Sequence, residues 1–332
     1  MGTGNASTLS DWAPFRIEPA FVDKVWGYRD LRPWFDRVAA AEPIGEVWLT
    51  GNQCTAGTGP HAGATLETLF AESAEALLGS GSIAAESPLL IKVIFALEKL
   101  SVQVHPDDRL AQKYGEPRGK TECWYVLAAD SDAALAVGLR PGATLEEVRH
   151  AIESGTLEAD LRLLPVSTGD MILVDAGTVH AVWPGSILLE VQQYSDTTYR
   201  LYDYGRPRPL HIDKGLEAIR TETRSGKVGA VALADRTVLI DTQYFRIERI
   251  AVSGRMRSER LAGDPNLNHP EAGLSYLFAA GGKGRITLDN SESLELNPRA
   301  IVCVPTAAPP FFVESPGGLD LIRITPRPPA NR

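Results

Sequence analysis

The sequence predicts a mainly β protein, a sandwich or barrel of antiparallel strands with helical insertions. The chain of 332 residues contains 30 glycines and 23 prolines spread throughout, and they separate short apolar runs rich in Val, Ile and Leu. Helical patterns are few, and they lie between groups of strands. A doubly wound sheet would instead alternate helices and strands one for one.

A series of short runs has the composition of strands bounded by turn residues. The predicted strands are Gly45–Thr50, Leu89–Leu97, Ser101–His105, Glu122–Ala128, Met171–Val174, Ser186–Gln192, Val238–Asp241, Phe245–Val252, Leu274–Ala280, Gly284–Leu288, Ala300–Pro305 and Leu319–Ile324. The predicted helices are Thr65–Leu78, Thr144–Ser154 and Leu210–Thr221. Thr144 and Glu147 have the spacing of a capping box at the start of the second helix.

The run Thr221–Ala234 is typical of a connection, which divides the chain into two expected domains. Residues 1–225 should contain the functional site. The later part of the chain has a single histidine, His269, and no cluster of residues that could bind a metal. Residues 226–325 repeat the theme of short strands and turns and form the second domain. The tail 326–332 is expected to be disordered.

Charge and cysteine usage limit the classes of function. A net charge of −9 argues against a nucleic-acid binder, which would need a basic face. The apolar run Pro88–Leu97 is too short for a membrane span, and the N-terminus has no signal-peptide pattern. The three cysteines are odd in number and far apart, which favours a reducing compartment, the cytoplasm, over a disulfide framework.

The densest polar signal is the run Leu100–Asp108, LSVQVHPDD. In a strand, residues two apart share a face, so Ser101, Gln103 and His105 should point one way. The intervening valines should point the other way, into a core. A polar row on one face of an otherwise apolar strand indicates a lined cavity.

Two further segments supply residues of the same kind. In GKTECWY, Lys120 and Glu122 should share a face, and a later apolar strand is followed by a Gly turn and His180. Two histidines, one glutamate and an amide oxygen, from Gln103, form a plausible zinc site that leaves room for water or substrate. From spacing alone a structural role for each histidine stays open.

These segments resemble type I mannose-6-phosphate isomerases, especially their shorter bacterial members. The resemblance covers much of the first 225 residues and is carried by many ordered matches. They are KVWG from Lys24, GEVW from Gly45, PLLIK from Pro88, LSVQVHPDD from Leu100, GKTECWYVL from Gly119, GTVHA from Gly177 and EVQQYSDTTYRLYDYGRPRPLHI from Glu190.

The resemblance implies a cupin fold, with a catalytic jelly-roll domain, a helical insertion and a second, degenerate cupin-like domain. It implies one zinc ion per chain, whose ligand positions fall on Gln103, His105, Glu122 and His180. In some short members the glutamine position is not a ligand. Asp175 is a departure, since the cupin pattern before Gly-x-x-His usually has proline, and a local change of the turn is expected.

The resemblance also implies the reaction, which interconverts mannose 6-phosphate and fructose 6-phosphate through a cis-enediol. Arg200 matches the catalytic arginine, which would stabilise the enediolate. Lys120 and Glu190 are candidates for ring opening or proton transfer, and neither is singled out as the base. Lys92 and Ser101 are candidate substrate contacts, and the chain is expected to act as a monomer or homodimer.

Simpler interpretations stay open for several of these residues. Lys120 could pair with Glu122 or Asp108, and Glu190 could be a buried partner of Arg200. Lys92 could extend to the surface. Asp107 could cap a turn together with Asp108. Trp26 and Trp48 are expected to lie in the core and not to form a platform for a sugar. His211 is expected to have a structural role and not to bind a metal.

Two other functions are compatible with the pattern. The same donor set can hold Fe(II) for oxygen chemistry in another cupin enzyme. A non-enzymatic sugar-binding cupin could also keep the metal site, although the presence of Lys120, Glu190 and Arg200 argues for catalysis. A purely structural zinc site fits poorly, because such sites favour four Cys or His ligands.

Overall fold

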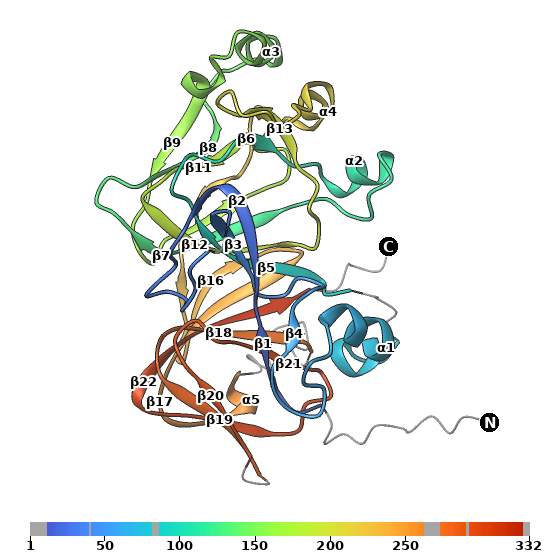
Figure 1. Ribbon diagram of the computed structural model, residues 1–332, viewed down its shortest axis with the longest axis vertical. Coiled ribbons are helices and arrows are strands. Elements are labelled where there is room, and N and C mark those ends of the chain that lie inside the picture. Colours follow the sequence, from blue (N-terminus) through green and yellow to red (C-terminus); the bar gives the residue numbers. More distant parts are fainter. Residues whose placement is uncertain (1–11, 40, 82–85, 262–272, 290–291, 328–332) are drawn as a thin grey trace, which may run out of the picture. The chain divides into compact units, whose positions relative to one another are not determined.

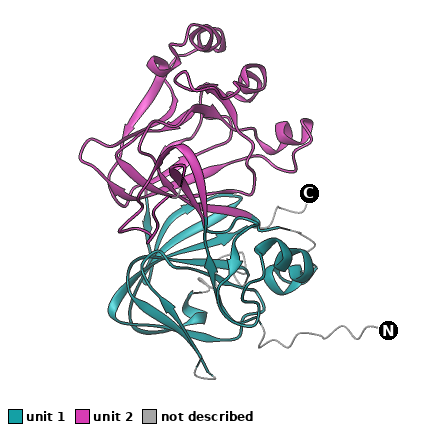
Figure 2. Cartoon of the chain, in the orientation of Figure 1, with its two compact units in different colours: residues 1–20, 49–88, 230–332 teal, residues 21–48, 89–229 magenta. Residues whose placement is uncertain are grey.

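A computed structural model describes residues 12–39, 41–81, 86–261, 273–289 and 292–327, and it shows a mainly β chain with few helices (Figure 1). The contacts group into two compact units, coloured separately in Figure 2. Unit 1 comprises residues 1–20, 49–88 and 230–332, and unit 2 comprises residues 21–48 and 89–229. The predicted mainly β class with helical insertions is confirmed.

Unit 2 is built from two antiparallel sheets. The seven-stranded sheet has the order β14-β10-β7-β12-β5-β3-β2, and the five-stranded sheet has the order β13-β6-β11-β8-β9. The strands of the first are β2 (Ala20–Tyr28), β3 (Ile44–Trp48), β5 (Leu89–Phe95), β7 (Glu122–Ala129), β10 (Met171–Val174), β12 (Ser186–Gln193) and β14 (Gly226–Lys227). Those of the second are β6 (Val102–Val104), β8 (Ala134–Leu139), β9 (Leu161–Pro165), β11 (His180–Val182) and β13 (Tyr199–Tyr202).

Apolar side chains from both sheets of unit 2 meet in one core. Ile94, Trp124 and Leu188 come from the seven-stranded sheet, and Leu135 and Val182 come from the five-stranded sheet. All five side chains are almost completely buried. The two sheets therefore form the expected jelly-roll sandwich, whose interior is shared by opposite faces.

Helices cover the outer face of the five-stranded sheet. Val102 and Val104 of β6 pack there with Val148 and Leu216 of the helices. The helices of unit 2 are α2 (Asp108–Lys113), α3 (Leu145–Glu153), α4 (Ile212–Ala218) and the short 3₁₀ helix Leu157–Asp160. Since the valines of β6 point toward these helices, the residue between them, Gln103, points into the sandwich.

The predicted capping box of α3 is confirmed. The Thr144 hydroxyl accepts from the Glu147 N–H at 3.2 Å, and the Glu147 carboxylate accepts from the Thr144 N–H at 2.8 Å. These reciprocal bonds satisfy two backbone donors that would otherwise have no partner within the helix. The observed helix starts one residue later and ends one residue earlier than the predicted range, at Leu145 and Glu153.

Unit 1 has one ten-stranded antiparallel sheet, in the order β15-β16-β17-β22-β18-β21-β1-β4, with β19 and β20 joined to it through β22. Its strands are β1 (Phe15–Glu18), β4 (Thr55–Ala56), β15 (Val231–Ala232), β16 (Thr237–Asp241), β17 (Phe245–Arg257), β18 (Ser275–Gly282), β19 (Gly284–Leu288), β20 (Ser293–Leu296), β21 (Ile301–Val304) and β22 (Phe311–Pro326). Its helices are α1 (Leu66–Leu78) and α5 (Ser258–Leu261).

Strand predictions agree best where an apolar run is bounded by turn residues, as at Met171–Val174 and Gly284–Leu288. The predicted strand Leu319–Ile324 is only part of β22. β13 was not predicted, because its sequence YRLY is short and lies among polar residues. Its strand conformation depends on pairing with β6, which is distant in sequence.

Both compact units are discontinuous in sequence, whereas the expected domains 1–225 and 226–325 are continuous. Residues 1–20 and 49–88 group with the C-terminal residues. The expected boundary lies close to the division between residues 229 and 230. In the expected tail, Pro326 ends β22, and residues 328–332 lie outside the described residues.

None of the helices in the described ranges has both the length and the apolar character needed to cross a bilayer. The cysteines Cys54, Cys123 and Cys303 are buried and form no disulfide.

Unit 1 contains a buried cluster of charge around Glu248. The Glu248 carboxylate is fully buried, and it accepts from Arg246 at 3.0 Å and from Arg323 at 3.1 Å. Arg236 lies 3.5 Å away. Asp235 also pairs with Arg236, and Asp241 pairs with Arg246. One carboxylate is therefore shared by three arginines inside unit 1.

Replacing Glu248 by Leu should lower the free energy of unfolding by about 3 to 5 kcal/mol, because it removes the carboxylate that buried guanidiniums share. The exposed Glu259 of the same unit offers a control, since Glu259→Gln should change that free energy by less than about 0.5 kcal/mol. Urea denaturation followed by circular dichroism measures both. Equal stabilities of the two variants would contradict the assigned role.

Candidate metal centre

His105, Glu122 and His180 converge inside unit 2. One potential ligand atom of each lies within 4.8 Å of the others, and all three residues are buried. His105 Nε2 is 3.5 Å from Glu122 Oε2, and His180 Nε2 is 3.4 Å from Glu122 Oε1. The three distant segments of the sequence are therefore brought together at distances that suit a shared metal ion.

Strand register explains this convergence. His180 of β11 pairs with Gln103 of β6 in the five-stranded sheet, and His105 follows two residues later on the same face. Glu122 begins β7 of the seven-stranded sheet. The triad therefore draws on both sheets and lies in the interior of the sandwich.

Hydrogen bonds fix the orientation of both imidazoles. His105 Nδ1 is 2.9 Å from the Thr197 carbonyl oxygen, and His180 Nδ1 is 2.9 Å from the Thr178 carbonyl oxygen. A carbonyl only accepts, so Nδ1 of each ring carries the proton and donates it. Nε2 of each ring then presents a lone pair toward Glu122, as metal-binding histidines do.

Burial keeps both imidazoles neutral. Burial lowers the pKa of His180 to about 4, although the hydrogen bond to Thr178 acts to raise it. Burial also lowers the pKa of His105 well below its usual value. Burial has the opposite effect on an acid: it raises the pKa of Glu122 to about 7, and the neighbouring Lys120 charge offsets only part of this.

Two side chains at the centre have buried atoms without a hydrogen-bond partner among the described residues: His105 at Nε2 and Glu122 at both carboxylate oxygens. A buried polar atom without a partner costs about 1 to 3 kcal/mol. A divalent cation between the triad atoms would satisfy both at once. The donor set, two imidazole nitrogens and a carboxylate, fits such an ion.

Gln103 lies beside the triad. Its amide nitrogen is 3.3 Å from His180 Nε2, and its amide oxygen accepts from the Ser101 hydroxyl at 3.2 Å. The predicted shared face of Ser101 and Gln103 is thus observed. A half turn of the carboxamide would exchange its oxygen and nitrogen with little change of shape and would direct the oxygen toward the triad.

Lys120 and Glu122 share a face, as expected, and their charged groups are 3.2 Å apart. This contact selects Glu122 as the partner of Lys120. Asp108 instead accepts from the Gly119 N–H at 2.8 Å. Asp107 caps α2 by accepting from the Leu110 N–H at 2.8 Å, which confirms a capping role for that aspartate.

The glycine before Lys120 allows two loops to pack closely. A Cβ atom at Gly119 would lie 2.5 Å from the backbone of Asp107 and 2.7 Å from the carbonyl oxygen of Pro106. That carbonyl accepts from the Lys120 N–H at 3.0 Å. The turn after His105 and the segment before Glu122 are therefore in backbone contact.

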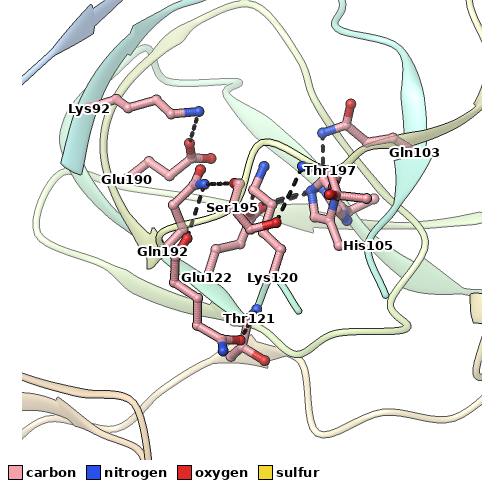
Figure 3. Close-up of polar contacts among 12 residues, drawn as sticks. Lys92, Gln103, His105, Lys120, Thr121, Glu122, Glu190, Gln192, Ser195 and Thr197 are labelled. Carbon is pink, nitrogen blue, oxygen red and sulfur yellow. Dashed lines mark hydrogen bonds and ion pairs between the residues drawn. The ribbon is translucent and has the colours of Figure 1, made fainter. Parts of the chain in front are cut away.

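Lys92 points inward and is 3% exposed, so it does not extend to the surface. Its ammonium lies 3.1 Å from Glu190 (Figure 3) and 3.7 Å from Glu46. Burial opposes its charge, but the two carboxylates outweigh burial and raise the pKa of Lys92. Glu46 also accepts from Trp48 Nε1 at 2.6 Å.

Glu190 is paired with Lys92 and not with Arg200. It also accepts from Trp124 Nε1 at 3.0 Å. Burial opposes ionisation of Glu190, yet the charges of Lys92 and Lys120 outweigh burial and lower its pKa to about 2. Glu190 is therefore a carboxylate at neutral pH, on the same face of β12 and its neighbours as Lys92.

Arg200 lies opposite Gln103 in the pairing of β13 with β6, so it belongs to the row of residues that contains Gln103 and His180. Its guanidinium donates to the Pro209 carbonyl at 3.0 Å and lies 3.9 Å from Asp203. Partial burial lowers the pKa of Arg200. The backbone N–H of Arg200 donates to His211 Nδ1 at 3.2 Å. This contact is structural, as expected for His211.

The remaining predictions near the site have simple outcomes. Trp26 is 3% exposed and lies in the core of the sandwich. Asp175, at the unusual turn before His180, pairs on the surface with Arg224 at 3.1 Å. The turn still positions His180, because the Gly177 N–H donates to the His105 carbonyl at 2.8 Å.

Some residues of the site were missed by sequence reasoning. Thr178 and Thr197 act through backbone carbonyls, which their side chains do not reveal. Glu46 lies in the GEVW segment, and its two-residue spacing from Trp48 was a usable signal. Gln192 and Gln193 carry no charge and were unremarked within a strand.

Comparison with known proteins gives a consistent family. The family model described as phosphomannose isomerase type I, catalytic domain, matches residues 15–137. The chain is 34% identical over 319 residues to the Bacillus subtilis protein named Probable mannose-6-phosphate isomerase GmuF, covering 91% of this chain and 96% of that protein. It is also 34% identical over 288 residues to the mannose-6-phosphate isomerase of Streptococcus mutans, covering 83% of this chain and 87% of that protein.

A solved structure agrees with these relatives. The crystal structure of the mannose 6-phosphate isomerase from Bacillus subtilis superimposes with a TM-score of 0.80 at 29% sequence identity. The match covers 94% of this chain and 99% of that chain. The similarity therefore extends over both compact units.

Divalent metal affinity should fall about tenfold for each pH unit below 7, because the ion must displace one proton from Glu122. The imidazoles add no further proton in this range, since burial lowers the pKa of His180 to about 4 and that of His105 well below its usual value. Competition with a metal-binding dye at several pH values from 5.5 to 8.5, about one unit apart, measures this slope. A slope near two protons, or none, would contradict the assignment of these pKa shifts.

Proposed function

This chain belongs to the type I mannose-6-phosphate isomerase family, and on that premise we propose that it interconverts mannose 6-phosphate and fructose 6-phosphate with one zinc ion. His105, Glu122 and His180 would hold the ion, with Gln103 as the fourth protein ligand after its carboxamide turns. The observation that carries the proposal is the buried triad, in which one potential ligand atom of each residue lies within 4.8 Å of the others.

Zinc is the ion we favour for this donor set. Catalytic zinc sites use His and Glu side chains from the protein and keep a position for water or substrate. Such an ion supplies Lewis-acid polarisation of the sugar oxygens at C1 and C2, which makes the proton next to the carbonyl more acidic. The remaining roles belong to side chains around the triad.

The isomerisation moves a proton between C1 and C2 by way of a cis-enediol. We assign Arg200 to stabilise the negative charge of the enediolate, because its strand position is in the same row as Gln103 and His180 and a guanidinium can offset such a charge. Lys120 faces the same centre through its contact with Glu122 and would assist ring opening or proton transfer.

Glu190 is assigned, together with Lys120, to ring opening or proton transfer. The neighbouring lysine charges outweigh burial and lower its pKa to about 2, so it is ionised at neutral pH. Lys92 and Ser101 are assigned to bind the sugar phosphate. A charged Lys92 held between two carboxylates offers a fixed donor to a substrate oxygen.

The competing functions differ in what they need from the site. An Fe(II) oxygenase could use the same triad but would not require the ammonium and guanidinium groups of Lys120 and Arg200 around it. A non-enzymatic sugar-binding protein would not require a buried, ionised Glu190. The family relation and these groups together favour the isomerase.

The proposed setting is the cytoplasm, and the proposed partner is a phosphorylated hexose. The cysteines are buried and form no disulfide, which suits a reducing compartment. The enzyme would act as a monomer or homodimer.

A coupled assay for fructose 6-phosphate tests the function. Purified protein should convert mannose 6-phosphate, lose activity in a strong chelator, and recover it with Zn²⁺, because the metal polarises the substrate. Oxygen uptake after Fe(II) loading tests the competing oxygenase. Absence of isomerase activity in the zinc-loaded protein, or activity that the chelator leaves intact, would overturn the proposal.

Arg200→Ala should lower kcat/KM by roughly 10²- to 10³-fold, as does removal of a group that stabilises an oxyanion. Zinc content should be unchanged, because Arg200 is outside the ligand set. Arg149→Ala, at an exposed position on α3, is the matched control and should keep full activity. Near-normal turnover of the Arg200 variant would remove Arg200 from the mechanism.

A further inference from the structure

Two successive glutamines end the strand β12. Gln192 is completely buried, and Gln193 is 6% exposed. Neighbouring residues of a strand point to opposite faces, so their side chains reach different parts of the structure. The Gln193 carboxamide contacts the segment that supplies Glu122, and the Gln192 carboxamide contacts the loop that orients His105.

Gln193 is bonded to the segment that carries Glu122. Its amide oxygen accepts from the Thr121 N–H at 2.9 Å, and its backbone N–H donates to the Thr121 carbonyl at 3.1 Å. Its amide nitrogen donates to the Asp108 carboxylate at 2.9 Å. The same carboxylate oxygen accepts from Gly119 at 2.8 Å. Gln193 thus joins the start of β7 to the turn that follows His105.

Gln192 is bonded to the loop that orients His105. Its amide nitrogen donates to the carbonyls of Ser195 and Gln193, the latter at 3.3 Å. The Ser195 hydroxyl accepts from the Thr197 N–H at 3.3 Å, and the Thr197 carbonyl accepts from His105 Nδ1 at 2.9 Å. Figure 3 shows the Gln192 amide beside Ser195, on the side of the strand that carries Glu190.

The chemistry of the neighbours fixes the orientation of both carboxamides. The amide nitrogen of Gln192 faces two carbonyl oxygens. A half turn of the carboxamide would place its oxygen against them, and two acceptors cannot form a hydrogen bond. The Gln193 oxygen faces an N–H and its nitrogen faces a carboxylate, so a half turn would break both bonds. Each glutamine can therefore hold its segment in one arrangement only.

We propose that Gln192 and Gln193 are positioning residues that set the metal ligands, Gln192 through His105 and Gln193 through Glu122. This inference rests on the zinc site of the proposed function. Residues that orient metal ligands contribute about 10- to 100-fold to metal affinity in other proteins. Two residues adjacent in sequence thus fix ligands that come from opposite sheets of the sandwich.

The test is the zinc affinity of Gln192→Leu and Gln193→Leu, measured by competition with a zinc-binding dye at pH 7.5. Each variant should bind Zn²⁺ about 10- to 100-fold more weakly than the parent chain. The double variant should bind Zn²⁺ more weakly than either single variant, because the two glutamines act on different ligands. Gln112→Leu, at an exposed position on α2, should bind as the parent does.

A destabilised core variant separates positioning from general loss of stability. Leu157→Ala removes a fully buried side chain from the core between helices and the five-stranded sheet. It should lower the melting temperature at least as much as the glutamine variants and leave the zinc affinity within threefold. Should either leucine variant fail to fold, Gln192→Asn and Gln193→Asn keep the amide but shorten its reach, and they should lose affinity in the same direction.

The outcomes are distinct. Glutamine variants that bind zinc within threefold of the parent, or a Leu157→Ala variant that loses as much affinity as they do, would overturn the positioning role. A parent chain that binds no zinc would overturn the proposed function first. Weaker zinc binding confined to the glutamine variants supports the inference independently of any isomerase activity.

Discussion

The structure of unit 2 depends on a carboxylate buried between its two sheets. Glu122 is completely buried, and burial raises its pKa to about 7. An ionised carboxylate is costly in such a place unless positive charge lies against it. Lys120 supplies one such charge at 3.2 Å, and a divalent ion between Glu122 and the two histidines would supply more. The packing around Gly119 and the two glutamines of β12 keeps these groups at that distance.

The two units deal with buried charge in different ways. In unit 1, Glu248 accepts directly from arginines, so its carboxylate is satisfied by protein groups. In unit 2, Glu122 Oε1 has no hydrogen-bond partner among the described residues. Among the residues that the structure describes, one group of three or more His, Cys, Asp or Glu side chains could share a metal ion. It consists of His105, Glu122 and His180. An open requirement for positive charge distinguishes a binding site from a structural cluster.

Local patterns in the sequence were enough to predict part of this arrangement. Alternation along Ser101–His105 placed the valines in one core and the polar residues in the sandwich, and the capping box placed the start of α3. The pairing of Glu190 could not be predicted. The choice between Lys92 and Arg200 depends on which strands are neighbours, and β12 pairs with β5. The roles of Gln192 and Gln193 could not be predicted for the same reason. Most of their partners are backbone groups, and some of these belong to segments that approach the glutamines only in the folded chain.

Two carboxylates of the site, Glu122 and Glu190, have opposite pKa shifts although the same lysines lie near both. Burial dominates at Glu122, and its pKa rises to about 7. At Glu190 the charges of Lys92 and Lys120, with the Trp124 N–H, outweigh burial, and its pKa falls to about 2. Pairs of acids whose environments separate their pKa values have separate roles in catalysis. In the proposed function, Glu122 would exchange a proton for a metal ion, whereas Glu190 would stay ionised beside Lys92. The strand register that places Lys92 opposite Glu190 therefore separates the pKa values of the two carboxylates.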